Sequence, residues 1–338
     1  MLRSFYSGVS GLKVNQVKLD VIGNNIANVG TTAFKSSRVR FKDMVSQSVN
    51  ESGAPGTSQG GVNPKQVGLG VQVSGIDTMV GQGAMQPTSR TLDVAIDGEG
   101  YLMVAKGKVP DTNADGITLG TDNVVDDPNG VELFYTRDGA LTLDKSGNLL
   151  NSDGLRILGY AVKEGANISL AYSGGAATPK FVDANKALTT ETTLIPLVIP
   201  EKIEDPNDAT KTLRVISYSI EKDGQIKAVL EDGKVSVLGQ IATSSFKNAA
   251  GLSKVGGNLF KNTSNSGEAV VRSGIGTDPD EDNSDAYGDV LSQMLEMSNV
   301  DLAEQFTDMI IAQRAFQASG KSITTGDEIL QELIGLKR

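Results

Sequence analysis

The chain has 338 residues with no cysteine, histidine or tryptophan, and 41 acidic residues outnumber 31 basic ones to give a net charge of −10. The missing residue types exclude disulfides, thiolate nucleophiles, imidazole bases and most zinc sites, so we expect no cofactor. The negative charge argues against a nucleic-acid partner, because neutralising phosphates needs clustered Lys and Arg. A chain of this length can hold about two or three modest domains.

Residues 1–30 carry a narrow apolar stripe at helical spacing, which is typical of a coiled-coil seam. Polar residues and glycines interrupt every apolar run in this segment. We therefore expect neither a general-pathway signal peptide nor insertion into a membrane. The stripe is formed by Leu2, Phe5, Val9, Leu12, Leu19 and Ile26, with Gln16 and Gly23 at the two remaining seam positions.

Residues 31–70 are predicted to be an extended connector, because residues 49–70 are rich in Gly, Ser, Asn and Gln and contain Pro55 and Pro64. The next stretch alternates apolar and polar residues between Asp-Gly pairs, which supply the positive φ angles of tight hairpin turns. This pattern predicts an antiparallel β body. The pairs begin at Asp97, Asp115, Asp138, Asp153, Asp223 and Asp232.

The β body is predicted to have two parts. Residues 71–161 and 239–278 form an inner β domain, and residues 162–238 form an outer β domain inserted into it. A second connector, residues 279–298, follows the acidic loop that starts at Asp278. The acidic loop itself is expected to be solvated.

Residues 299–338 repeat the narrow apolar stripe of the N-terminus. The chain enters and leaves the β body through terminal helices, so the two helices should run antiparallel. The predicted fold class is therefore multidomain α+β, with a terminal antiparallel coiled coil and mainly antiparallel β domains. The C-terminal stripe is formed by Leu302, Phe306, Met309, Phe316, Ile323, Leu330 and Ile334.

Short continuous motifs occur along the chain. They are LDVIGNNIANV at 19–29, TTAFK at 31–35, LDVAIDGEGY at 92–101, YTRDG at 135–139, FKN at 246–248, GGN at 256–258, SNVDL at 298–302, QRAFQA at 313–318 and DEILQEL at 327–333. These motifs resemble the flagellar rod and hook family of axial proteins. The resemblance covers both ends and most of the body, and only residues 162–238 are unmatched. Ala33 stands where the family usually has Gly, so the resemblance alone does not predict a left-handed φ there.

Within this family, the C-terminal residues resemble hook subunits more than rod subunits, and the inserted β segment also favours hook over rod. The resemblance implies a non-enzymatic homopolymer, a curved tube that transmits torque as a flexible joint. It implies rod, hook–filament junction, hook cap and export-apparatus proteins as partners, and an extracellular location reached without a cleaved signal peptide. The motif positions that it carries over are Asn24, Asn25, Asn28, Asn299, Asp301, Gln313 and Arg314.

Three local features have alternative interpretations. The loop from Asp111 to Asp122 has the oxygen-donor spacing of a calcium loop, but its late Asp is shorter than the usual Glu and no flanking helices are apparent, so a plain acidic turn is the preferred interpretation. The asparagines of the N-terminal motif are either intersubunit hydrogen-bonding groups or the ordinary residues of a helix end. The two stripes either join neighbouring subunits or form a hairpin that serves this chain alone, which would leave Val14, Val17 and Ile310 exposed.

Two other functions are considered. A distal rod subunit would share the terminal helices but would be straight and rigid. A secreted acidic glycosidase would need paired carboxylates and aromatic sugar platforms. Aromatic residues make up only 5% of the chain, and no carboxylate pair stands out.

Overall fold

The structure is a computed structural model that describes residues 2–54, 56, 60–120, 122–127, 130–165, 167–205, 211–278, 280 and 282–336. Its contacts divide the chain into two compact units. The helical unit contains Met1–Gly30, Lys35–Gly81 and Asn299–Arg338, and the β body contains Thr31–Phe34 and Gln82–Ser298. The described part of the chain is thus mostly β with one helix near each end, as the sequence predicts.

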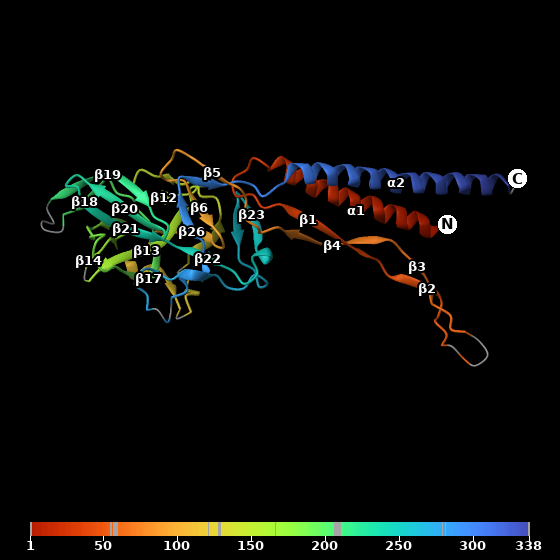
Figure 1. The fold of residues 1–338 in the computed structure, drawn as a ribbon, viewed down its shortest axis with the longest axis horizontal. Coiled ribbons are helices and arrows are strands. Elements are labelled where there is room, and N and C mark those ends of the chain that lie inside the picture. The colour runs from red at the N-terminus through yellow and green to blue at the C-terminus, as the bar shows by residue number, and fades with distance from the viewer. Residues whose placement is uncertain are drawn as a thin grey trace. The chain divides into compact units, whose positions relative to one another are not determined.

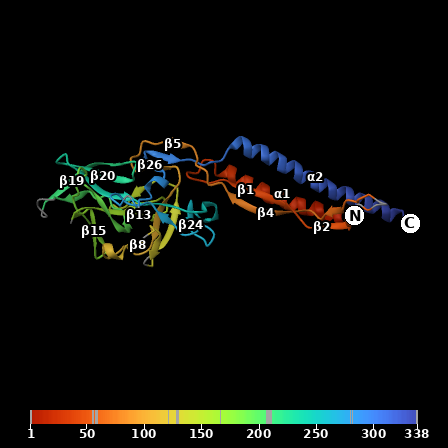
Figure 2. The same cartoon turned by 60° about the horizontal axis from the view of Figure 1, so that its bottom comes forward.

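Two antiparallel helices, α1 (Leu2–Ala27) and α2 (Leu302–Gly335), lie side by side in the helical unit, with the N- and C-termini at the same end (Figures 1 and 2). Asp301 is the N-cap residue of α2. Its Oδ1 accepts hydrogen bonds from Ala303 N at 2.8 Å and Glu304 N at 3.3 Å. Near the end of α1, the Asn28 side chain donates to Asn24 O at 2.9 Å.

The range predicted as the first connector contains strands. β1 (Ser37–Asp43) pairs antiparallel with β4 (Val71–Thr78), and β2 (Ser46–Asn50) pairs with β3 (Lys65–Gly68). The Gly- and Asn-rich composition concealed these strands, because their residues alternate only weakly and every described side chain of β2 and β3 is exposed.

In the β body, antiparallel pairing joins seventeen strands into one large sheet. The Asp-Gly pairs explain four turns of the body, since Gly98, Gly154, Gly224 and Gly233 all have positive φ. The large sheet comprises β7 (Tyr101–Lys106), β8 (Ile117–Leu119), β9 (Val125–Asp127), β10 (Glu132–Thr136), β11 (Thr142–Leu143), β12 (Leu149–Leu150), β13 (Arg156–Glu164), β14 (Asn167–Ile168), β17 (Thr189–Pro196), β18 (Lys202–Glu204), β19 (Thr212–Ile220), β20 (Gln225–Leu230), β21 (Val235–Ile241), β22 (Thr243–Ser245), β23 (Ser253–Gly256), β24 (Leu259–Lys261) and β25 (Val270–Val271).

Three short ribbons complete the body. They pair β5 (Met85–Pro87) with β27 (Met294–Glu296), β6 (Val94–Asp97) with β26 (Asp289–Ser292), and β15 (Leu170–Ser173) with β16 (Ala176–Pro179). β26 and β27 fall in the range predicted as the second connector. Their register places the C-terminal end of the body directly against its first strands.

The core of the body draws on both predicted β domains. Its largest cluster includes Leu102 and Ile157 from the inner range together with Leu197 and Leu213 from the outer range. The strand β13 crosses the predicted boundary at residues 161 and 162. The division into an inner and an inserted outer domain therefore stays a prediction, and within this structure the two ranges are packed as one unit.

Candidate assembly surface

Small residues bring the two helices together. A side-chain carbon added at Gly8 would lie 2.9 Å from Ile323 Cγ1, and one added at Gly11 would lie 3.0 Å from Ser319 Oγ. One turn closer to the start of α1, a carbon on Gly326 would lie 3.0 Å from the Phe5 ring. The in-chain contact between α1 and α2 is therefore narrow and has no room for larger side chains at these positions.

Polar groups hold the rest of the contact. Lys18 Nζ lies 3.2 Å from Asp308 Oδ1, and both side chains are partly exposed. The Asn25 side chain donates to Gln305 Oε1 at 3.0 Å and to Ser37 O at 2.8 Å, and its Oδ1 accepts from Ser37 N at 3.0 Å. Asn25 is 2% exposed, so it pins the end of α1 to α2 and to β1 within the chain.

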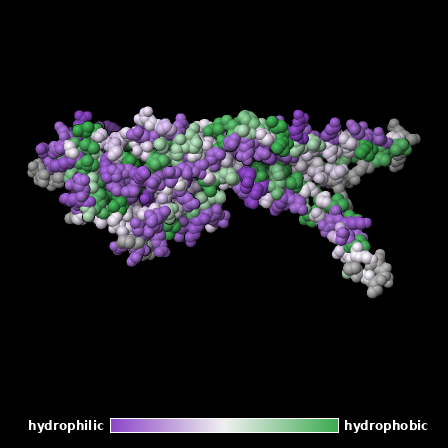
Figure 3. Space-filling view, in the orientation of Figure 1, coloured by the Kyte–Doolittle hydropathy of each residue, from purple (hydrophilic) through white to green (hydrophobic). Residues whose placement is uncertain are grey.

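Large apolar side chains project outward from the same helices. Phe306 is 50% exposed and Ile334 is 70% exposed, although such side chains are normally buried. Apolar patches are visible over both ends of α2 in Figure 3. The exposed large apolar residues of the described helices are Tyr6, Val9, Leu302, Phe306, Ile310, Ile311, Phe316, Ile329, Leu333, Ile334 and Leu336.

The predicted seam residues divide into two groups. The side chains of Phe5, Leu12, Leu19, Ile26, Met309, Ile323 and Leu330 are half-buried, whereas Val9, Leu302, Phe306, Phe316 and Ile334 are exposed. The side chain of Leu2 lies outside the described residues. The most buried line on α1 runs through Gly8, Val14, Ile22 and Asn25, which is one residue out of phase with most of the predicted stripe.

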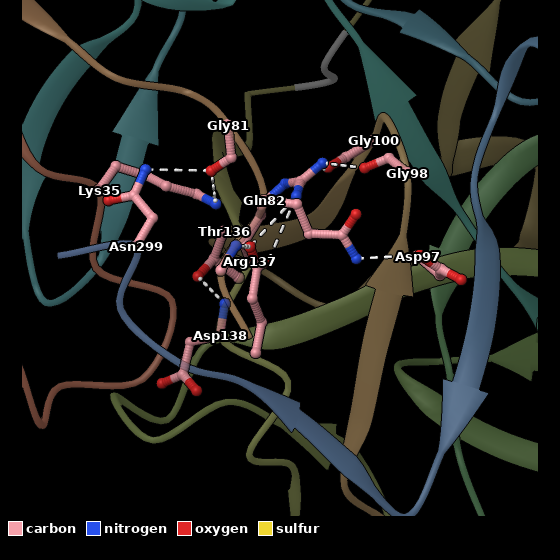
Figure 4. Close-up of polar contacts among 12 residues, drawn as sticks. Lys35, Gly81, Gln82, Asp97, Gly98, Gly100, Thr136, Arg137, Asp138 and Asn299 are labelled. Atoms are coloured by element: carbon pink, nitrogen blue, oxygen red, sulfur yellow. Dashed lines mark hydrogen bonds and ion pairs between the residues drawn. The ribbon is translucent and has the colours of Figure 1, made fainter. Parts of the chain in front are cut away.

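The motif residues also take different places. Asn24 and Asn28 bond to each other, with Asn28 Nδ2 2.7 Å from Asn24 Oδ1. Asn299 accepts from Ser36 N at 2.8 Å and donates to Met79 O and Gly81 O, as Figure 4 shows in part. Gln313 and Arg314 are exposed on α2. For Asn25 and Asn299 the structure thus supplies partners within the chain.

Sequence reasoning did not identify Gly8, Gly11 and Lys18 as contact residues. The small residues spaced three apart at the start of α1 were the available signal, because small side chains at this spacing share one helix face. Lys35 was also missed. Its side chain is 1% exposed, and its Nζ donates to Gly81 O at 2.9 Å within the helical unit.

The segment Thr31–Phe34 belongs to the β body. Ala33 is 2% exposed and has φ 54°, so this position keeps a left-handed backbone without the glycine usual in the family. Its N–H donates to Glu296 O at 2.8 Å. Thr32 Oγ1 donates to Asp138 Oδ1 at 3.1 Å, and Lys254 Nζ lies 5.1 Å from the centre of the Phe34 ring.

Burial shifts the pKa values of several polar side chains in the body. Burial raises the pKa of the Asp138 carboxyl, although hydrogen bonds from Ala140, Thr32 and Ser152 partly offset this effect. Burial likewise raises the pKa of Tyr135 to about 12 and lowers the pKa of Lys254. These shifts reflect packing of the body and lie outside the helical surface.

In the candidate calcium loop, several of the side chains that would bind the ion are already engaged in contacts within the chain. Asp111 pairs with Lys108 at 2.5 Å, and Asp115 Oδ2 accepts from Thr112 N and Thr112 Oγ1. Asn113 donates to Leu170 O. Within the described residues, no group of three or more acidic side chains is arranged to hold a metal ion. The structure favours the acidic turn.

Over the described residues, neither helix contains a stretch long and apolar enough to cross a membrane.

Comparison with known proteins supplies the family. Models described as "Flagella basal body rod protein", "Flagellar hook protein FlgE/F/G D1 domain" and "Flagellar basal body rod FlgEFG protein C-terminal" match residues 5–35, 124–228 and 291–336. The flagellar basal-body rod protein FlgG of Bacillus subtilis is 41% identical over the whole of both chains. This chain belongs to the flagellar rod and hook family of axial proteins.

The relatives include proteins named as hook proteins as well as proteins named as rod proteins. The flagellar hook protein FlgE of Borreliella burgdorferi is 31% identical, and the whole of both chains is covered by an alignment of 473 positions. A solved structure, the flagellar hook protein FlgE2 of Helicobacter pylori, covers 63% of this chain and all of its own at 9% identity, with a TM-score of 0.39. The relatives are structural proteins of the flagellum, and this chain is a structural subunit of the flagellar axial structure.

Proposed function

We propose that this chain polymerises into a helical tube through its terminal helices. The observation that carries the proposal is the outward apolar surface of α1 and α2, whose in-chain contact is already filled by Gly8, Gly11 and Ser319. Exposed apolar area of this kind on a narrow helix pair is characteristic of a surface that other helices cover. Neighbouring copies of the chain supply those helices.

Within the axial structure, we place the chain in the hook, the flexible joint that transmits torque from rod to filament. The C-terminal residues support this placement. The segment 162–238 does not favour hook over rod, because the domain model named for FlgE, FlgF and FlgG together matches residues 124–228, and the expectation that this segment is unmatched in the family was wrong. A hook subunit contacts copies of itself, the rod and hook–filament junction proteins, the hook cap and the export apparatus. It acts outside the cell, is exported without a cleaved signal peptide, performs no catalysis, binds no nucleic acid and does not insert into a membrane.

The distal rod is the second candidate, and the relatives give a specific reason for it. The Bacillus subtilis rod protein aligns over 338 positions, so it needs no residues beyond those of this chain. Alignments with two hook proteins extend to 473 and 495 positions, which means that those relatives carry long insertions. The length argument for the hook is therefore countered by a relative of higher identity.

Immunoelectron microscopy of isolated hook–basal bodies separates the two placements. Antibody raised against the β body should label the curved hook along its whole length and leave the rod unlabelled. Cells lacking the gene should retain complete rods and have no hooks. Label confined to the rod, or loss of the distal rod in the deletion strain, would assign the chain to the rod instead.

Electron microscopy of the purified chain tests polymerisation itself. Concentrated wild-type protein should form tubes, whereas a chain lacking residues 299–338 should stay monomeric with its body folded. The truncated chain keeps all the strands, so its circular-dichroism spectrum should retain the β signal. Tubes formed by the truncated chain would contradict the helical assembly surface.

A further inference from the structure

Glu296 and Arg137 form a buried ion pair in the β body. Arg137 Nη1 lies 3.3 Å from Glu296 Oε2, and the two side chains are 5% and 0% exposed. The proposed assembly through the helices makes no use of this pair. A buried pair that loses one partner leaves an uncompensated charge, so both residues depend strongly on each other.

Arg137 uses its other donors on the turn between β6 and β7. Its Nε donates to Gly100 O at 2.9 Å, and its Nη2 donates to Gly98 O (Figure 4). The guanidinium carbon lies 5.3 Å from the centre of the Tyr101 ring. The planar fork of Arg therefore connects Glu296 on β27 with a turn that is almost 200 residues earlier in the chain.

Glu296 in turn accepts hydrogen bonds from two further segments of the body. Its Oε1 accepts from Gly83 N at 2.8 Å, and its backbone oxygen accepts from Ala33 N at 2.8 Å. Gly83 is packed so closely that a side-chain carbon on it would lie 1.9 Å from Met297 O. One residue thus fixes the segments around positions 33, 83 and 296.

These three segments are the ones that continue covalently into the helical unit. The chain passes between the units at residues 30 and 31, 34 and 35, 81 and 82, and 298 and 299. Any force transmitted along the backbone between the units therefore reaches the body through these segments. The ribbon β5–β27 has only three residues per strand, so its own backbone pairing is a weak attachment.

We propose that the Arg137–Glu296 pair is the mechanical anchor through which load from the terminal helices enters the β body. This inference rests on the proposed function only in that a torque-bearing tube supplies the load. Several bonds must break together before Glu296 can leave, because one guanidinium holds it to Gly98 and Gly100. Arg137 is a positioning residue in this proposal. It joins two of the family segments, because it belongs to YTRDG and donates to Gly98 and Gly100 of LDVAIDGEGY.

Single-molecule pulling on the full chain tests the anchor. The chain has no cysteine, so handles can be attached at two introduced cysteines. Lys321→Cys with Glu231→Cys loads the body through the segments that lead from the helical unit, whereas Ser146→Cys with Glu231→Cys loads the body internally. Arg137→Gln should rupture about tenfold faster at constant force in the first geometry, which corresponds to about 1.4 kcal/mol of lost barrier. The rupture rate in the second geometry should stay unchanged.

Arg272→Gln is the matched control. Arg272 is also buried in the body, and its Nη1 donates to Gly288 O at 3.4 Å, a hydrogen bond that involves neither Arg137 nor Glu296. This variant should lower the melting temperature of the body while leaving rupture in the first geometry at the wild-type rate. Equal acceleration by Arg137→Gln and Arg272→Gln in that geometry would show a general loss of stability and would overturn the anchor.

Two further variants keep the test decisive if Arg137→Gln does not fold. Arg137→Lys retains the charge but cannot donate to Gly98, Gly100 and Glu296 together, so it should rupture at an intermediate rate. Glu296→Gln still accepts from Gly83 N and should rupture faster than wild type in the first geometry only. A wild-type rate in both variants would overturn the proposal.

The pulling experiment acts on single chains and does not depend on polymerisation. Failure of the chain to form tubes would overturn the proposed function while leaving the anchor measurable. Normal tubes combined with an unchanged rupture rate in Arg137→Gln would overturn the anchor alone.

Discussion

The helical unit and the β body differ in how far their large apolar side chains are exposed. In the body, the exposed large apolar side chains among the described residues are Leu143, Ile216 and Val255, and most of the others belong to four buried clusters or pack against them. The helical unit exposes Phe306, Ile310 and other large side chains along both helices. The body is thus complete as a single folded unit, whereas the helices present a surface that is satisfied only by further contacts.

The two regions also differ in the types of residue that form their internal contacts. Small residues bring α1 and α2 close together, and Phe5, Ile323 and a few polar pairs complete their in-chain contact, while large aliphatic and aromatic residues fill the body. Small residues allow close approach but bury little apolar area, so they stabilise a helix pair weakly on their own. In the proposed tube, the helices would therefore form most of their stabilising contacts with neighbouring subunits.

The largest expected effect is loss of assembly on changing one exposed helical residue. Phe306→Asp should abolish tube formation, because burying an unpaired carboxylate between subunits costs several kcal/mol. The melting temperature of the β body should be unchanged. Sedimentation and circular dichroism measure the two effects.

Ile216→Asp is the control for this comparison, since Ile216 is 67% exposed on β19 of the body. It should assemble as the wild type does. If Phe306→Asp assembles normally, or if it melts the body, the contrast between the two regions is wrong.

The next effect tests the close packing of the body. Gly139→Ala should destabilise it by about 3 kcal/mol or more, because the added methyl would lie 1.6 Å from Val94 O. Gly120→Ala is the control, since its nearest neighbour would be Val124 O at 3.7 Å. Urea denaturation of both variants measures the difference, and equal midpoints would contradict the packing at Gly139.

A smaller effect is expected at the left-handed residue of the segment Thr31–Phe34. Ala33→Gly should stabilise the body by about 0.5–1 kcal/mol, because relief of the strained φ exceeds the added freedom of the unfolded chain. Ala33→Val should destabilise it instead. Denaturation midpoints that fall for Gly and rise for Val would show that the backbone is not left-handed at this position.

The smallest effect is a pH dependence at Asp138, whose folded pKa is raised above the ordinary value of 3.8. The folded state then binds more protons than the unfolded state, so the stability that this group contributes is present below pH 3.8 and is lost as the pH rises through the raised pKa. Asp138→Asn removes this dependence. The stability of the wild type minus that of the variant should therefore fall with rising pH, and a difference that increases would contradict the shift.

Residue patterns alone predicted the two terminal helices, the mostly β body and the turns at Gly98, Gly154, Gly224 and Gly233. These features depend on local periodicity and on the conformational freedom of glycine, which act over a few residues. The family was recognisable for the same reason, because its motifs are continuous segments. The turns expected at Gly116 and Gly139 did not acquire positive φ, since both residues are constrained by contacts from distant strands.

Tertiary structure decided which residues meet. The in-chain helix contact includes Gly8 and Asn25 as well as the predicted seam residues Phe5 and Ile323, because apolar periodicity marks a face without naming its partner. The strands β1 to β3 escaped detection because they are stabilised by pairing with segments from 15 to 41 residues away, from Asn50 with Lys65 to Ser37 with Thr78. The Arg137–Glu296 pair joins positions 159 residues apart, and only folding brings such a pair together.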